Sequence, residues 1–234
     1  QALPLELKII KSQLRIRQWY ERHRGQVYVS FSGGKDSTVL LHLVRSMYPD
    51  VPAVFCDTGL EYPEIRRFVM EHEDVEIVRP KMNFQQVKEK DGWPIISKEQ
   101  SQFIEDVRRG TSEKLVNIRL NGKRLKDGRI GRLGRISDRW RYLIDAPFKI
   151  SNKCCDVMKK GPMNRYGRES SRLSITGEMA GDSRLRRNLY LTQGGCNAFG
   201  GKHPKSTPLG FWTEQDILRY LVEFDIPYCP VYGN

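Results

Sequence analysis

"SFSGGKDSTVLLHLV" (residues 30–44) places glycines, a lysine, an aspartate and serines between two apolar runs. Val27, Tyr28 and Val29 precede it, and this β-branched and aromatic run predicts a short buried strand. The apolar residues after it recur at helical spacing on one face and are Val39, Leu40, Leu43, Val44 and Met47. The glycine-rich segment therefore joins the end of a strand to the start of a helix.

This junction predicts an anion-binding loop. Backbone N–H groups at a helix N-terminus are unpaired, and the helix dipole adds positive potential. Gly33 and Gly34 would let the backbone approach a ligand, and Lys35 adds a charge. A tight strand–helix turn with a capping Ser or Asp is the alternative, but such a turn needs fewer polar residues. The patterns G-x-x-x-x-G-K-[ST] and G-x-G-x-x-G are both absent from this loop.

The composition describes a soluble protein. The chain has 234 residues, of which 38% are hydrophobic, enough for one large domain or a domain with an appendage. Its mean hydropathy is −0.58, and no apolar run approaches the roughly 20 residues of a membrane span. No signal peptide is recognised, so we expect a cytoplasmic protein without membrane contact. The first residue is Gln1 rather than Met, which suggests a trimmed start, and trimming at the end is left open.

Basic residues exceed acidic ones, and the excess is concentrated. The chain carries 40 Lys and Arg against 28 Asp and Glu, a net charge of +12. Between Arg119 and Arg141 the only acids are Asp127 and Asp138, and the basic residues are Arg119, Lys123, Arg124, Lys126, Arg129, Arg132, Arg135, Arg139 and Arg141. This segment predicts a surface for nucleic acid or another polyanion, with mainly phosphate contacts; a solvated charged face is the alternative.

The order of elements predicts a doubly wound parallel α/β sheet. We expect strands at 27–29, 53–56 and 75–78, and helices at 4–23, from Val39, from Pro63, and at 97–109 and 212–224, with 110–150 irregular. In such a sheet, ligands bind at the carboxyl ends of the strands, where segments 32–37 and 57–64 fall. We divide the chain into an N-terminal helix (1–25), an α/β core with a basic insert at about 110–150 (26–150), and a cysteine-bearing helical part of the same domain (151–234).

Several motifs resemble known families. Residues 32–37, SGGKDS, resemble the pyrophosphate loop (PP-loop) of the adenine-nucleotide α-hydrolase superfamily. The stretches "DTGLEYPE" (57–64), "CCDVMKKGP" (154–162), "ITGEMAGDSRLRR" (175–187) and "STPLGFWTEQDILRYLVEFDIPYCPVY" (206–232) resemble elements of the phosphoadenosine-phosphosulfate (PAPS) reductase family within it. The resemblance runs from about residue 27 to the end, apart from the basic 83–150 region.

The resemblance implies an adenine-nucleotide site with Lys35, Asp36 and Asp57 as catalytic candidates. Either aspartate would serve as a magnesium or ribose contact. The nucleotide-binding residues that it implies are Ser30, Ser32, Gly33, Gly34, Lys35, Asp36, Ser37, Asp57, Thr58, Gly59 and Gly177.

The cysteines leave two interpretations open. The chain has five cysteines, and a disulfide framework is not expected in a cytoplasmic chain of this size. Buried free thiols are one interpretation. The resemblance of the Cys154–Cys155 pair to iron–sulfur members of the family favours the other, in which Cys154, Cys155, Cys196 and Cys229 hold a [4Fe–4S] cluster.

Three functions compete. Met179 stands where family reductases carry an arginine, and their CxxC and tail cysteine do not appear before Asn234. Together with the net charge of +12 and the basic insert, these departures lead us to expect an ATP pyrophosphatase, similar to DNA-phosphorothioation and tRNA-thiolation enzymes. It would use ATP–Mg²⁺ to adenylate DNA or tRNA for sulfur transfer from a donor such as a cysteine desulfurase. The second function is a sulfonucleotide reductase, with sulfate and phosphate held by Lys159, Lys160, Arg184, Arg186 and Arg187. The third is a nucleic-acid-binding module without activity. The predicted nucleic-acid or anion contacts are Arg129, Arg132, Arg135, Lys159, Arg184 and Arg187.

Overall fold

The computed structural model describes residues 2–200 and 204–233. The chain forms two compact units. Unit 1 comprises residues 1–79 and 163–234, and unit 2 comprises residues 80–162. The two connections between the units therefore lie at 79/80 and 162/163. The boundaries predicted from the sequence are 25/26 and 150/151. Among the described residues no helix is long and apolar enough to cross a membrane.

Unit 1 is built on a six-stranded sheet in the order β3-β2-β1-β6-β8-β7. Its strands are β1 (Val27–Ser30), β2 (Ala53–Cys56), β3 (Val75–Val78), β6 (Leu173–Thr176), β7 (Asn197–Ala198) and β8 (Lys205–Ser206). All neighbouring strands are parallel except β7, which pairs antiparallel with β8. The predicted α/β fold with a mainly parallel sheet is thus confirmed.

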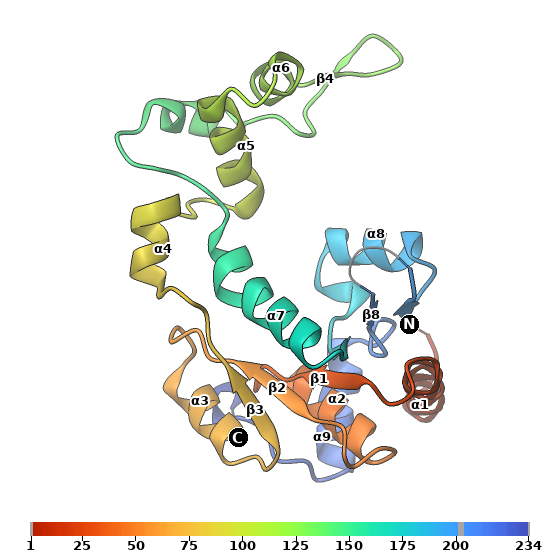
Figure 1. Ribbon diagram of the computed structural model, residues 1–234. Coiled ribbons are helices and arrows are strands. Elements are labelled where there is room, and N and C mark those ends of the chain that lie inside the picture. The colour runs from red at the N-terminus through yellow and green to blue at the C-terminus, as the bar shows by residue number, and fades with distance from the viewer. Residues whose placement is uncertain (1, 201–203, 234) are drawn as a thin grey trace. The chain divides into compact units, whose positions relative to one another are not determined.

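Helices cover both faces of this sheet, as Figure 1 shows. The helices are α1 (Leu5–Arg22), α2 (Lys35–Arg45), α3 (Pro63–Met70), α7 (Gly161–Glu169), α8 (Arg184–Thr192) and α9 (Glu214–Glu223). Successive side chains of β1 point to opposite faces of the sheet. Val27 and Val29 belong to the main core on one face, and Tyr28 packs with Tyr166 of α7 on the other. Two short 3₁₀ helices, η3 (Ala180–Asp182) and η4 (Pro230–Tyr232), complete the unit.

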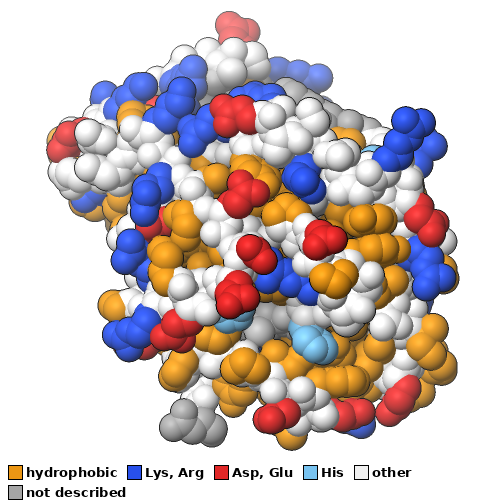
Figure 2. All heavy atoms as spheres, turned by 60° about the horizontal axis from the view of Figure 1, so that its bottom comes forward, with side chains coloured by type: hydrophobic (Ala, Val, Ile, Leu, Met, Phe, Trp, Pro, Cys, Tyr) orange, Lys and Arg blue, Asp and Glu red, His pale blue; other side chains and the backbone are white. Residues whose placement is uncertain are grey.

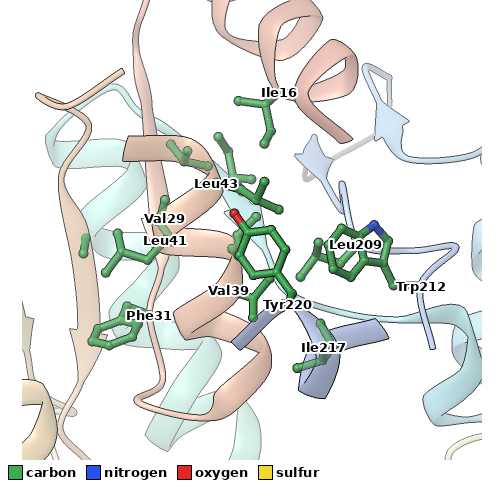
Figure 3. Close-up of a cluster of buried hydrophobic side chains, with 14 of the residues drawn as sticks. Ile16, Val29, Phe31, Val39, Leu41, Leu43, Leu209, Trp212, Ile217 and Tyr220 are labelled. Carbon is green, nitrogen blue, oxygen red and sulfur yellow. The ribbon is translucent and has the colours of Figure 1, made fainter. Parts of the chain in front are cut away.

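The main core lies between the sheet and helices α1, α2 and α9. Figure 3 shows Ile16 of α1, Leu43 of α2, and Trp212 with Tyr220 from the α9 region gathered around it. Trp212 is fully buried, and its indole N–H donates to Ser12 Oγ at 2.9 Å. The core thus fixes α2, and with it the loop that precedes α2, against the carboxyl edge of β1.

Unit 2 is helical, with a smaller core of its own. It contains α4 (Phe84–Asp91), α5 (Lys98–Arg109), α6 (Glu113–Asn121), a hairpin of β4 (Lys123–Arg124) and β5 (Ile130–Gly131), the 3₁₀ helix η1 (Asp138–Asp145) and the π-helix η2 (Asp156–Lys160). Phe103, Ile104 and Ile136 are among its buried residues. The expectation of an irregular 110–150 segment is wrong, because Ser112 caps α6 and the apolar residues of this segment pack on α5.

Candidate functional site

The PP-loop lies between β1 and α2, as predicted. Gly33 has φ 71°, and a Cβ there would stand 2.7 Å from Val69 Cγ2 and 2.8 Å from Ile65 Cγ2. Any side chain at this position would therefore collide with α3 while forcing a left-handed backbone. Gly34 is the N-cap residue of α2 and supplies no side-chain cap. The N-cap residue thus offers no side-chain acceptor to the N–H groups of the first turn of α2, an arrangement typical of anion-binding helix N-termini.

Two serines stiffen this loop. Ser37 Oγ donates to the Gly34 carbonyl at 2.8 Å and accepts from the Ser32 N–H at 3.2 Å. The hydroxyls of Ser32 and Ser37 lie 3.1 Å apart. The loop is therefore closed on itself around the N-terminus of α2 by its own hydrogen bonds.

Lys35 is ion-paired with two carboxylates, those of Asp36 and Glu214. Its Nζ lies 2.8 Å from Asp36 Oδ1 and 3.1 Å from Glu214 Oε1. Burial lowers the pKa of Lys35, but the hydrogen bonds and charges of Asp36 and Glu214 outweigh burial and raise it above its ordinary value. Lys35 is therefore an ammonium ion at neutral pH and could exchange a carboxylate partner for a phosphate.

Tyr232 lies against the loop between β1 and α2. It is not among the site residues predicted from the sequence. Its hydroxyl is 3.1 Å from where a Cβ on Gly34 would stand, and the Lys35 Nζ is 5.8 Å from the ring centroid. Burial raises the pKa of Tyr232, so the phenol is neutral at physiological pH, and the backbone of Lys35 hydrogen-bonds to it. The η4 turn thus brings a hydroxyl next to Gly34 and Lys35 at the N-terminus of α2.

Gly177 follows β6, the strand beside β1. A Cβ on Gly177 would lie 3.2 Å from the carbonyl carbon and oxygen of Asp36. The backbone after β6 therefore passes directly beside the first turn of α2, which only a small residue permits. The two loops meet where the strand order turns from β1 toward β6, the position at which doubly wound sheets bind ligands.

Asp57, at the end of β2, is held by two arginines. Its side chain is buried, and its Oδ2 lies 3.4 Å from Arg66 Nε and 3.3 Å from Arg79 Nη2. Gly59 donates its N–H to Asp57 Oδ1 at 3.3 Å, and Thr58 Oγ1 donates to Glu61 Oε1 at 2.7 Å. The part of Asp57 in binding a ribose or magnesium stays a prediction, and the structure adds Arg66 and Arg79 as cations at this strand end.

The predicted anion contacts fall in both units. Arg184 and Arg187 lie on the exposed side of α8 in unit 1, whereas Arg129, Arg132, Arg135 and Lys159 belong to unit 2. Met179, the position of the expected family arginine, is buried in the main core.

The four cysteines of the predicted cluster are divided between the units. Cys196 and Cys229 are buried in the main core of unit 1, and Cys154 and Cys155 are half-buried in unit 2. Within the described ranges 2–200 and 204–233, no three His, Cys, Asp or Glu side chains are placed to hold a metal ion. Neither unit alone thus supplies a four-thiolate set, and the [4Fe–4S] cluster stays a prediction.

Comparison with known proteins identifies the family. The sequence profile of the "Phosphoadenosine phosphosulfate reductase domain" matches residues 26–107 and 96–234. The chain belongs to this family. The predicted relationship is therefore confirmed over nearly the whole chain, the basic insert included.

Relatives in the PAPS reductase family agree on one type of activity. A phosphoadenosine 5′-phosphosulfate reductase of Xylella fastidiosa is 25% identical over 99% of this chain and 78% of its own length. An adenosine 5′-phosphosulfate reductase of Bacillus cereus is 23% identical over 95% of this chain and 74% of its own length. The fold matches a PAPS reductase of Candida auris, crystallised as a phosphate complex, with TM-score 0.53 and 15% identity over 95% of this chain and 83% of that one.

These relatives overturn the expected ATP pyrophosphatase. The prediction of an adenylating sulfur-transfer enzyme depended on the net charge of +12, the basic insert, Met179 and the cysteines absent before Asn234. The curated relatives that align along almost the entire chain are named sulfonucleotide reductases.

Proposed function

We propose that this protein is a sulfonucleotide reductase, which releases sulfite from adenosine 5′-phosphosulfate or its 3′-phosphorylated form. The observation that carries the proposal is the anion seat at the N-terminus of α2, closed by Ser32 and Ser37 and flanked by Lys35. The names of the relatives in the family support the sulfonucleotide as the ligand of this seat.

The reaction breaks the bond between sulfur and the bridging oxygen of the phosphosulfate. A thiolate attacks the sulfur, an S–S bond forms, and the bridging oxygen leaves with the bonding electron pair as part of the nucleotide phosphate. A second thiolate then attacks the sulfur of the first thiol, so that a disulfide forms and sulfite departs. Two thiols are thereby oxidised, and the sulfur of the sulfate group is reduced by two electrons.

The loop is suited to stabilise the leaving nucleotide. As the S–O bond breaks, the phosphate gains one negative charge, which develops where the α2 N-terminus and the Lys35 ammonium ion point. Donors that are already fixed in place stabilise this charge without reorganising. Asp36 and Glu214 must then yield their contacts with Lys35 to the phosphate.

The thiols that drive the reaction are not the core cysteines. Cys196 and Cys229 are 4% and 0% exposed, so a substrate cannot reach them without unfolding the core. The reaction takes a dithiol reductant, such as reduced thioredoxin, in place of the predicted sulfur donor. We place it in the cytoplasm, whose reducing conditions keep dithiol reductants such as thioredoxin available.

The test offers both sulfonucleotides with reduced thioredoxin or dithiothreitol and measures sulfite and the released nucleotide. We expect equal amounts of sulfite and of AMP or adenosine 3′,5′-bisphosphate, at a rate that Lys35→Ala lowers strongly. Arg22→Ala, on an exposed turn of α1, is the control and should leave the rate unchanged. If neither sulfonucleotide yields sulfite above the rate of reductant alone, and neither binds in calorimetry, the proposal is wrong.

A further inference from the structure

The excess positive charge of the chain belongs to unit 2. Its 83 residues hold 20 of the 40 Lys and Arg but only 10 of the 28 Asp and Glu. Unit 1 has 20 basic and 18 acidic residues, which nearly cancel. Figure 2 brings forward the bottom of Figure 1, where α3 and α9 of unit 1 lie, and acidic, basic and hydrophobic side chains are mixed there. A surface that binds a polyanion is therefore expected on unit 2.

The β4–β5 hairpin is the best-defined basic feature of unit 2. Lys123 pairs with Gly131 and Arg124 with Ile130. A Cβ on Gly122 would lie 2.4 Å from the Gly131 carbonyl oxygen, so the two strands meet closely at their base. Figure 1 shows the hairpin projecting beyond α6. It therefore presents its side chains to solvent on both faces.

Arg119 anchors this hairpin instead of contacting a ligand. Its Nε lies 2.9 Å from Asp106 Oδ2, and its Nη1 donates to the Gly134 carbonyl at 3.0 Å. The guanidinium also stacks on Phe103, 3.8 Å from the ring centroid. The irregular segment after the hairpin is held by the Ile136 N–H, which donates to the Arg119 carbonyl at 2.7 Å. The base of the hairpin is thus rigid relative to α5 and α6.

Some basic side chains in and after the hairpin form ion pairs with acidic residues, and others do not. Arg129 is ion-paired with Asp127 at 2.6 Å, and Arg135 and Arg141 are ion-paired with Asp138 at 2.7 and 3.2 Å. In residues 123–132, which are the hairpin and the residue after it, four exposed cations form no ion pair with the described part of the chain, namely Lys123, Arg124, Lys126 and Arg132. Only Arg132 of the three arginines predicted from sequence therefore belongs to the unpaired set.

We propose that the β4–β5 hairpin binds the phosphate backbone of duplex DNA through these four unpaired cations. A projecting two-stranded ribbon with its side chains fits the major groove of B-form DNA, about 12 Å wide, and places cations toward the phosphates on either side. The tip of the hairpin is formed by Lys126, Asp127, Gly128 and Arg129. Duplex DNA offers phosphates for these cations and a groove for the ribbon, whereas an anionic membrane surface offers negative charge alone, which favours DNA.

The experiment measures binding of the full chain to a fluorescent DNA duplex of about 20 base pairs while salt is varied. Four phosphate contacts predict that log affinity falls linearly with log salt, with a slope of about −3.6. Arg124→Ala with Arg132→Ala should make the slope less steep by about 1.8. The matched control is Arg22→Ala with Arg219→Ala, which removes the same charge from exposed positions of unit 1 and should leave the slope unchanged.

Circular dichroism and thermal unfolding of both double variants verify that they fold. A slope that changes equally in the two variants would show a diffuse charge effect and overturn the hairpin as the site. Absence of binding at low salt, or tighter binding to anionic vesicles than to DNA, would overturn DNA as the partner. If an RNA duplex binds as tightly as the DNA, the hairpin does not bind in the major groove, because the major groove of A-form RNA is too narrow for the ribbon.

Discussion

Lys35 lies between two carboxylates at the anion seat, and both partners can be tested by substitution. Lys35→Ala removes one charge-assisted phosphate contact, which costs about 1.5–3 kcal/mol and should weaken binding of adenosine 5′-phosphosulfate or AMP by about 10- to 150-fold. Calorimetric titration of the folded variant measures this change. Unchanged affinity would show that the Lys35 Nζ, 2.8 Å from Asp36, keeps its carboxylate partner when the nucleotide binds.

Glu214 competes with the ligand for Lys35, so its removal should have the opposite effect. The Glu214 carboxylate is two-thirds exposed and lies 3.1 Å from the Lys35 Nζ. Exposed ion pairs contribute about 0.2–1 kcal/mol, so Glu214→Gln should strengthen nucleotide binding by up to about fivefold. The same titration measures this gain. Weaker binding in this variant would mean that Glu214 contacts the ligand itself.

The sequence predicts the residues of the loop itself, but not the side chains that reach the loop from other segments. Gly33, Gly34 and Lys35 carry a local signal, because the turn, the helix start and the charge lie within a few positions. Glu214 and Tyr232 reach the loop from distant segments, through the packing of α9 and the η4 turn, and no local pattern marks them. Long-range contacts of this kind depend on the folded sheet.

Gly33, between β1 and α2, must be a glycine for two reasons that can be tested separately: its positive φ and the lack of space for a side chain. Gly33→Ala should lower the free energy of unfolding by about 1–2 kcal/mol for its positive φ, and by about 1–3 kcal/mol more for the collision with Val69 and Ile65. Gly194→Ala is the control, because Gly194 has φ 82° and open space around its Cβ position. Urea denaturation compares the two variants. Equal losses would mean that α3 gives way to the new methyl group.

Helices α1 and α9 are joined by a buried ion pair with a predictable response to pH. Lys8 Nζ lies 2.5 Å from Asp216 Oδ2. Burial raises the pKa of Asp216, but the hydrogen bonds from Lys8 and Thr213 outweigh burial and hold it below the ordinary 3.8. The stabilisation is therefore complete above the ordinary value and is lost as pH falls through the lowered pKa.

Asp216→Asn tests this pair. The variant leaves Lys8 buried without its counter-charge, which should cost about 3–5 kcal/mol at neutral pH. Below about pH 4 the stability of the wild type should fall more steeply than that of the variant, because the variant has no carboxyl to protonate. Urea denaturation at a series of pH values measures both. Parallel acid profiles would show that Asp216 titrates alike in the folded and unfolded chains.

The predicted elements hold wherever the apolar period is clear, as in strands β1, β2 and β3. They fail in residues 110–150, where charged and glycine residues hide the short helix α6 and the hairpin. Ile136 and Leu143 of this segment are buried by packing on α5, which the sequence pattern of the segment itself does not reveal. Strand β8, with two residues, is too short to give a periodic signal.

For the whole molecule, unit 2 leaves and re-enters unit 1 at one place. Arg165 Nη2 donates to the Arg79 carbonyl at 2.9 Å, so the two connections of the insert lie together. Replacing residues 80–162 by a linker of about four residues should leave a unit 1 that unfolds cooperatively and binds the nucleotide as the full chain does. Circular dichroism and calorimetry test this. Loss of cooperative unfolding would show that unit 1 depends on unit 2.

The position of unit 2 also sets the order in which the protein can form during translation. Val27 of β1 pairs with Leu173 of β6, and all of unit 2 is encoded between them. A ribosome adds about 5–20 residues per second, so the insert takes about 4–17 seconds to emerge. During that interval β1 can pair with β2 but exposes its other edge, a template for mispairing with neighbouring chains. The nascent chain is therefore most vulnerable to aggregation, and most dependent on chaperones, between the synthesis of β3 and that of β6.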